Sequence, residues 1–195
     1  DKDRAHKLSH AVGAAVPASF TAERGMDAGK VLEQAEQLGY PLFVKPVRAG
    51  SSYGITKVMA RNALPAAVKL AFAYDDRIIL EEAVSGFEVG CAVLGNNRLT
   101  VGELDEIELS GGFFDYTSAI HVPARISPEK ALEIKELAKR IYRALDCRGF
   151  ARVDFFLDKS GQVLFNEVNT IPGFTAHSRY PSMMKAVGLS FEQVI

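Results

Sequence analysis

The chain has 195 residues, which is enough to bury a substantial core in one large domain or two small ones. Its 23 Lys and Arg residues nearly balance its 24 Asp and Glu residues, which argues against nucleic acid or an anionic membrane as a partner. No apolar run reaches the roughly 18 to 20 residues of a membrane span, and no stretch resembles a signal peptide, so we expect a cytoplasmic protein. Cys91 and Cys147 lie far apart without CxxC spacing, which favours two buried free thiols over a disulfide.

The first part of the chain alternates between helical and extended patterns. Gly13 and Gly39 each follow a helical pattern and act as helix stops. Helices are predicted over 1–12, 31–38 and 63–73, and extended segments over 16–20, 41–44, 55–59 and 78–81. We therefore expect a small α+β domain over residues 1–84.

The second part of the chain predicts a sheet with one long helix. Strands are predicted over 88–94 and 99–104, a polar loop over 110–121, an amphipathic helix over 128–145, and two more strands around the turn 158–161. Apolar residues at helical spacing form the inner stripe of that helix: Ala131, Ile134, Leu137, Ala138, Ile141 and Leu145. We therefore expect a second α+β domain over residues 85–195.

The last two predicted strands carry oxygen ligands. Strand alternation around the turn would bring Asp154 beside Glu167 and Asn169 on one polar face, with apolar neighbours holding the hairpin to a core. Magnesium prefers oxygen ligands and shares its coordination shell with substrate phosphates, so this set indicates phosphoryl transfer. The alternative reading is a charged hairpin tip without a metal.

The segment VKPVRAGSSYGI, residues 44–55, is typical of phosphate binding. Lys45 follows a buried strand, and the small residues Gly50, Ser51, Ser52 and Gly54 let backbone N–H groups approach phosphate oxygens. Neither a Walker loop nor a Rossmann GxGxxG pattern occurs, so the two commonest nucleotide folds lose support. A lysine that caps a strand beside a flexible turn is the structural alternative.

A glutamate-rich segment, residues 80–88, has the pattern of an interdomain hinge. Its main chain could read adenine, and Glu88 is suited to accept hydrogen bonds from two ribose hydroxyls. A solvated glutamate cluster at a strand end is the simpler interpretation of this segment alone. Lys2, near a helix start, has the same simple alternative.

Five motifs in this order closely resemble D-alanine–D-alanine ligases and their vancomycin-resistance relatives in the ATP-grasp superfamily. They are VKPVRAGSSYG, EEAVSGFEVG, RVDFF, NEVNTIPG and TAHSRYP. The resemblance runs over essentially the whole chain and implies an ATP-grasp fold, in which two α+β domains clasp ATP between them. It also implies that these are the central and C-terminal domains of a three-domain ligase whose N-terminal domain is absent from this chain.

The resemblance assigns roles to residues by position. The nucleotide contacts are Lys2 and Lys45 for phosphates, Ser51 and Ser52 for the covering loop, Glu81 for adenine, Glu82, Ala83 and Val84 for the hinge, Glu88 for ribose, and Asn166. The ligands of two Mg²⁺ ions, or of Mn²⁺ as a substitute, are Asp154, Glu167 and Asn169. The catalytic set is Arg152 and the Gly173 N–H at the oxyanion, Ser178 near the second substrate, and Ser51.

The chemistry implied by the resemblance belongs to peptidoglycan precursor synthesis. ATP phosphorylates the carboxylate of D-alanine, and a second substrate then attacks the acyl phosphate. The segment Ser178-Arg179-Tyr180-Pro181 is similar to resistance-type ligases, whereas Phe113-Phe114-Asp115-Tyr116 lacks the histidine of the D-lactate branch. Together these segments favour D-serine as the second substrate, then D-alanine, and the family suggests a homodimer.

The loop over 111–123 departs from the family pattern. It is several residues short and lacks a Lys-Tyr pair, so a real deletion would let water compete for the acyl phosphate. We interpret His121 as a loop residue and not as a base, and His177 as ordering the substrate loop or serving structure alone. Two alternative functions remain at this point, a catalytically incomplete ATP-binding module and another ATP-grasp carboxylate–amine ligase.

Overall fold

The computed structural model describes residues 1–107, 119–175 and 177–195, and its chain divides into two compact units. The first unit contains residues 1–4 and 17–84, and the second contains residues 5–16 and 85–195. Helix α1 (Lys2–Ala11) begins in the first unit and continues into the second. No helix in the described part of the chain has the length and apolar character needed to cross a membrane.

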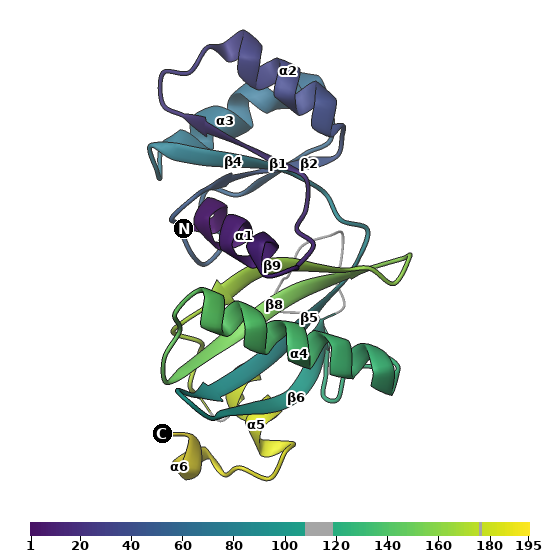
Figure 1. Ribbon diagram of the computed structural model, residues 1–195. Helices are drawn as coiled ribbons and strands as arrows, with labels where there is room; N and C mark the ends of the chain where they lie inside the picture. The colour runs from purple at the N-terminus through teal and green to yellow at the C-terminus, as the bar shows by residue number, and fades with distance from the viewer. Residues whose placement is uncertain (108–118, 176) are drawn as a thin grey trace. The chain divides into compact units, whose positions relative to one another are not determined.

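The first unit is an antiparallel sheet covered by two helices on one face (Figure 1). The strand order is β1-β4-β2-β3. The strands are β1 (Ser19–Glu23), β2 (Leu42–Pro46), β3 (Thr56–Val58) and β4 (Arg77–Glu82), and the helices are α2 (Ala28–Leu38), α3 (Leu64–Phe72) and the short 3₁₀ helix η1 (Arg61–Ala63). Asp27 caps α2 by accepting a hydrogen bond from the Lys30 N–H at 2.9 Å, and Gly39 ends it with a φ of 80°.

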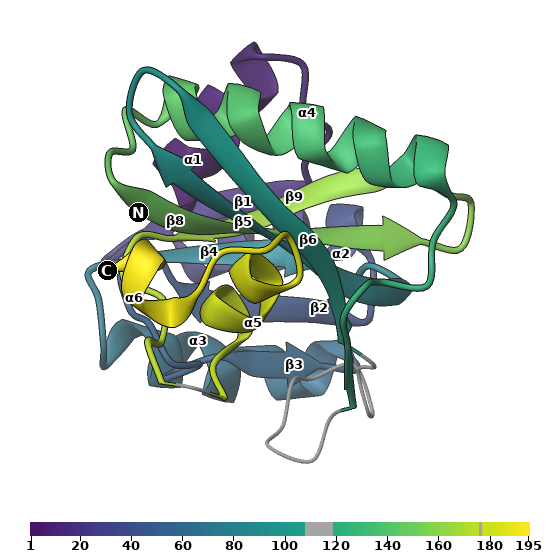
Figure 2. The same ribbon diagram turned by 90° about the horizontal axis from the view of Figure 1, so that it is seen from below.

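The second unit is a five-stranded sheet with helices on both faces (Figure 2). The strand order is β7-β6-β5-β8-β9, and all pairs are antiparallel. The elements are β5 (Gly86–Gly95), β6 (Leu99–Ile107), β7 (Ile120–His121), α4 (Pro128–Ala144), β8 (Phe150–Asp158), β9 (Val163–Asn169), α5 (Arg179–Lys185) and α6 (Phe191–Val194).

Two apolar clusters sandwich the larger sheet. Helix α4 begins after Ser127, which accepts from the Lys130 N–H at 3.2 Å, and it buries Ile134, Ala138 and Ile141 against one face. On the other face α5 packs Tyr180 and two methionines against the strands. The second face is the one that carries the polar residues described below.

Two structural details differ from the sequence prediction, and one predicted segment lies outside the described residues. His121 was predicted to lie in a loop, but it lies in β7, where it pairs with Glu106 at the edge of β6. Both cysteines are free, but only Cys91 is buried, while Cys147 is half-buried next to the end of α4. Most of the predicted short loop, residues 111–118, lies outside the described residues.

Candidate active site

A bulge in β9 sets which residues face Asp154. Strands β8 and β9 pair Phe155 with Phe165 and Asp154 with Glu167, so β9 has one extra residue, Asn166, between the two pairs. Strict alternation would place Glu167 on the same face as the buried Phe165. The bulge turns the strand instead, so Asp154 and Glu167 are neighbours as predicted, but the cause is the bulge and not strict alternation.

Another register pair on the same face brings Arg152 and Asn169 to the same end of the hairpin. Arg152 lies opposite Asn169, two pairs beyond Asp154 and Glu167, with the pair of Val153 and Val168 between them. All four predicted residues therefore lie side by side on two strands. The three predicted metal ligands offer only oxygen donors, which fits Mg²⁺. Among the described residues, no group of three or more His, Cys, Asp or Glu side chains is placed to hold a metal ion. The proposed set therefore has only two carboxylates, and its third ligand is the side-chain amide oxygen of Asn169.

Asp154 is a buried carboxylate with an arginine partner. Its side chain is 1% exposed, and Arg152 donates from Nε to Oδ1 at 2.7 Å and from Nη2 to Oδ2 at 2.9 Å. Burial raises the pKa of the Asp154 carboxyl, but the charges of Arg152 and Arg179 outweigh it and hold the pKa below its ordinary value. The carboxylate is thus kept ionised, which is the form that binds a cation.

Arg179 is the centre of a second set of ionic contacts. It donates from Nε to Asp105 Oδ2 at 2.7 Å, from Nη2 to Asp105 Oδ1 at 2.8 Å, and from Nη1 to Glu88 Oε1 at 2.9 Å. Its Nη2 also lies 3.5 Å from Asp154 Oδ1. The Gly90 N–H donates to Asp105 Oδ1 at 2.9 Å, so a strand backbone completes the cluster.

Asp105 and Arg179 were not among the predicted site residues. Asp105 is fully buried on β6, where a charged side chain requires partners. The signal in the sequence is a carboxylate inside the strand segment GELDEI, but only the fold shows that Arg179, 74 residues away, neutralises it.

Glu88, the predicted ribose ligand, lies against Arg179 in this structure. Burial, followed by the negative charge of Asp154, raises the pKa of Glu88 to about 7, although Arg179 acts in the opposite direction. The Glu88 carboxyl is therefore protonated more readily than an exposed glutamate.

Two predicted nucleotide residues meet on the smaller sheet. Lys45 on β2 and Glu81 on β4 form a buried ion pair, with side chains 9% and 2% exposed. The Lys45 ammonium also lies 5.4 Å from the centre of the Phe43 ring. A buried lysine with a carboxylate partner is a fixed positive charge, as phosphate binding requires.

The predicted hinge residues contact the start of β1 and the segment before β2. Glu82 Oε1 accepts a hydrogen bond from the Ala18 N–H at 2.8 Å, and the Ala83 N–H donates to Pro41 O at 3.2 Å. Val84 is half-buried. The hinge is therefore tied to its own sheet through both side chain and backbone.

The predicted phosphate loop has a left-handed backbone. Ser51 and Ser52 are exposed, with φ angles of 50° and 58°, and Gly54 has a φ of 72°. Lys2 reaches the start of this loop and donates from Nζ to Ala49 O at 2.8 Å. The structure thus brings Lys2, Ser51 and Ser52 to one region of the first unit.

The remaining predicted residues lie after β9 or in its bulge. A Cβ on the exposed Gly173 would lie 2.9 Å from Ser178 Oγ, so these two residues are neighbours. The Ser178 hydroxyl accepts from the Thr175 N–H at 3.0 Å, and His177 beside it is exposed. The carbonyl of Asn166 accepts a hydrogen bond from His6 Nε2 at 2.9 Å.

Comparisons with known proteins identify close relatives. The family model described as "D-ala D-ala ligase C-terminus" matches residues 10–195. The vancomycin B-type resistance protein VanB of Enterococcus faecalis is 45% identical over all of this chain and 59% of its own length. The crystal structure of the VanG D-Ala:D-Ser ligase from Enterococcus faecalis is 57% identical with a TM-score of 0.93, over 100% of this chain and 59% of that one.

A D-alanine–D-alanine ligase structure from Coxiella burnetii is more distant. It is 34% identical with a TM-score of 0.88, over 99% of this chain and 53% of that one. The present chain thus spans little more than half the length of each of these relatives.

Proposed function

Because the chain belongs to the D-alanine–D-alanine ligase family and has its ATP-grasp fold, we propose that the complete protein joins D-alanine to a second D-amino acid with consumption of ATP. The second substrate is D-serine as the first choice and D-alanine as the second. One observation carries the proposal: Arg152, Asp154, Glu167 and Asn169 form two register pairs of β8 and β9 that are separated by one pair, which puts them on the same face. The product would serve peptidoglycan precursor synthesis in the cytoplasm.

The first unit supplies the groups that would hold the nucleotide. Lys45 is buried and paired with Glu81, so it presents a charge whose position is fixed. Ser51 and Ser52 follow each other with positive φ angles, and we propose that the backbone N–H groups of this turn receive phosphate oxygens. In this proposal Lys45 binds phosphate and Glu81 reads adenine.

The second unit supplies the groups that would hold metal and the reacting carboxylate. Asp154, Glu167 and Asn169 would bind Mg²⁺, which when bound neutralises the terminal phosphates of ATP during in-line transfer. Arg152 holds Asp154 ionised and lies beside it, where its remaining N–H groups can meet an oxyanion. The Gly173 N–H is proposed as the second oxyanion donor, with Ser178 next to it for the second substrate.

The preference for D-serine rests on two sequence segments. The segment Ser178-Arg179-Tyr180-Pro181 is similar to resistance-type ligases, and Phe113-Phe114-Asp115-Tyr116 lacks the histidine of the D-lactate branch. The 57% identity to a D-Ala:D-Ser ligase also supports this choice.

Two alternatives predict different products. A nucleotide-binding module without activity would bind ATP and release no product, and a different carboxylate–amine ligase would not use D-alanine. The motif AHSRYP and the family match over residues 10–195 favour the D-alanine ligase over both.

The test is an ATP-dependent ligation assay on the complete protein. D-alanine is supplied with D-alanine, D-serine or D-lactate, and products are identified by mass spectrometry. We expect D-alanyl-D-serine to dominate. Dominant D-alanyl-D-alanine would overturn the D-serine preference. ATP binding with neither phosphate release nor product would overturn the ligase assignment, and phosphate release without ligated product would mean that the acyl phosphate is lost to water. Light scattering on the same sample tests the homodimer that we propose.

A further inference from the structure

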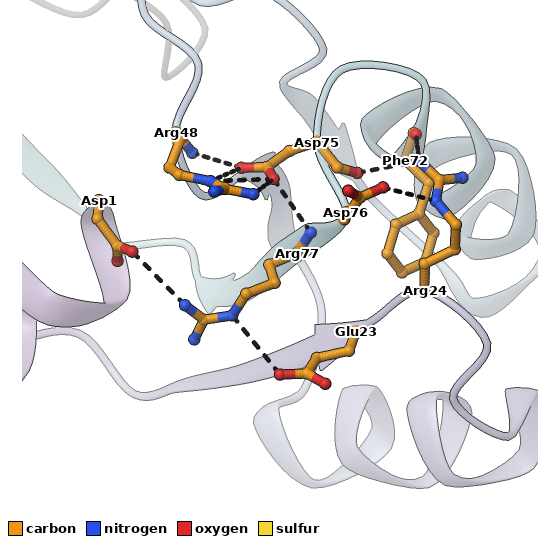
Figure 3. Close-up of polar contacts among 8 residues, drawn as sticks. All are labelled: Asp1, Glu23, Arg24, Arg48, Phe72, Asp75, Asp76 and Arg77. Atoms are coloured by element: carbon orange, nitrogen blue, oxygen red, sulfur yellow. Dashed lines mark hydrogen bonds and ion pairs between the residues drawn. The ribbon is translucent and has the colours of Figure 1, made fainter.

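The turn between α3 and β4 lies beside the loop that we have proposed as the phosphate cover, which here means residues 48–54. Figure 3 shows Arg48, the first residue of this loop, bonded to Asp75 of the turn. This loop connects β2 to β3, and the turn consists of residues 73–76. Two neighbouring side chains of the turn, Tyr74 and Asp75, contact opposite ends of the loop. Neither residue belongs to the proposed nucleotide-binding set.

Asp75 fixes the start of the loop. Its Oδ2 accepts from the Arg48 backbone N–H at 2.8 Å, and its Oδ1 accepts from Arg48 Nη2 at 2.5 Å and from the Arg77 N–H at 3.2 Å. The Asp75 side chain is 3% exposed, whereas that of Arg48 is 58% exposed, so the carboxylate is the anchored partner. The hydrogen bond from the Arg48 side chain lowers the pKa of Asp75 well below its usual range.

A neighbouring backbone contact reinforces the same end. The Val47 N–H donates to Arg77 O at 3.0 Å, immediately before the residue that Asp75 holds. The chain therefore leaves β2 with its direction fixed by β4 and by the turn that precedes β4. A loop whose first residue is fixed loses much of the conformational freedom that it would otherwise have.

Tyr74 fixes the end of the loop. A Cβ on Gly54 would lie 2.6 Å from Tyr74 Cδ2 and 2.8 Å from Pro46 Cγ, so the glycine backbone is pressed between the two rings. The Tyr74 ring also lies 6.2 Å from the Tyr53 ring, with 32° between their planes. Tyr74 is 52% exposed and Tyr53 is 63% exposed, so these contacts and not burial explain where the ring lies.

The backbone between these two ends needs such support. Ser51 and Ser52 both have positive φ angles, which are uncommon for residues with a side chain. Conformations of this kind persist only where the surroundings determine them. The contacts at Arg48 and Gly54 are surroundings of the required kind at each end.

We propose that Tyr74 and Asp75 form a two-point clamp that holds the phosphate-cover loop in the conformation that receives ATP. Both are positioning residues, because they act through Arg48 and Gly54 and not on the nucleotide. The inference rests on the proposed function only where it names ATP as the ligand of the loop.

The test compares loop order and nucleotide affinity in five variants of the complete protein. Amide hydrogen exchange reads the Tyr53 and Ile55 N–H groups, which bond within the loop to Gly50 O at 3.1 Å and Ser52 O at 3.3 Å. Tyr74→Ala and Asp75→Asn should both exchange faster there. If each substitution leaves about one-tenth of the wild-type population in the competent conformation, each should raise the dissociation constant of Mg-ATP about tenfold, with kcat unchanged at saturation.

Two variants serve as controls. Tyr74→Phe keeps the ring over Gly54, and Asp76→Asn makes the same chemical change as Asp75→Asn on a 76% exposed side chain that pairs with Arg24. Both should behave as the wild-type protein.

A further variant tests the Asp75 end of the clamp, because Asp75 is buried and its loss can unfold the unit. Arg48→Met removes the same contact from the exposed side and should also speed exchange.

The outcomes separate the clamp from the function of the loop. Unchanged exchange at Tyr53 and Ile55 in both Tyr74→Ala and Arg48→Met would overturn the clamp. A second outcome combines faster exchange in these variants with a wild-type loop that gains no protection when Mg-ATP is added. This outcome would support the clamp and overturn the phosphate-binding role. Faster exchange with weaker Mg-ATP binding supports both.

Discussion

Gly90 lies beneath the ionic cluster of the larger sheet, and replacing it with alanine is the sharpest test of that cluster. A Cβ at this position would lie 2.5 Å from Arg179 Nη2 and 3.1 Å from Asp154 Oδ1, and it would also press on Asp105. Ordinary contacts begin at 3.4 Å, so the arginine must retreat by about 0.9 Å. Its 2.8 Å bond to Asp105 cannot survive a movement of that size.

The expected loss follows from two terms. Overpacking a buried site costs about 1 to 3 kcal/mol, and losing a buried hydrogen bond between charged groups costs about 1.5 to 3 kcal/mol. We therefore expect Gly90→Ala to lower the free energy of unfolding of the second unit by about 3 to 6 kcal/mol, a large part of a typical domain stability. The KM for the second amino acid should rise as well, because Arg179 is displaced.

Urea unfolding measures the change in the free energy of unfolding. Far-UV circular dichroism monitors the transition, because the chain has no Trp for a fluorescence signal. Gly29→Ala is the matched control, since its Cβ meets only the Asp27 side chain, with Oδ1 nearest at 3.0 Å, and alanine favours a helix by up to about 1 kcal/mol. A loss below about 1 kcal/mol for Gly90→Ala, with an unchanged KM, would show that the cluster is not packed as described.

Three further predictions concern other parts of the site. Arg152→Ala should lower kcat by about 10² to 10³ and ATP affinity much less, and equal losses in turnover and in a nucleotide titration would contradict its oxyanion role. The pKa of Asp75 is lowered from 3.8 in the folded protein, so its contribution to stability is present above about pH 4 and is lost as the pH falls. Melting temperatures at falling pH should therefore decline less in Asp75→Asn than in the wild type, whereas Asp76→Asn should keep the full decline. His6→Phe removes the donor to the Asn166 carbonyl and should cost about 1 to 3 kcal/mol and weaken Mg²⁺ binding, while unchanged titration with Mg²⁺ would show that the bulge is held without it.

The elements with strong local patterns could be predicted from the sequence. The amphipathic segment 128–145 became α4 (Pro128–Ala144), because Ser127 caps it and its apolar stripe is long. The hairpin of β8 and β9 was predicted from its turn and its alternation. The ATP-grasp fold followed from five motifs in order and is confirmed by the family match.

What the sequence could not show depends on contacts between distant segments. The bulge at Asn166 was implied only by a change of parity between Phe165 and Val168, which strict alternation does not accommodate. The partnership of Arg179 with Asp105 joins residues 74 positions apart, and no local pattern encodes it. Pairings of this kind arise only when the sheet and α5 have both formed.

The bulge in β9 also determines where this hairpin tolerates changes of length. The turn after Asp158 lies outside both register pairs of the site, so residues inserted there would lengthen the tip and leave the pairing of Asp154 with Glu167 intact. One residue gained or lost between Phe165 and Glu167 would rotate Glu167 and Asn169 to the opposite face of the sheet. Homologues should therefore vary in length at the tip and keep a constant spacing from Phe165 to Asn169.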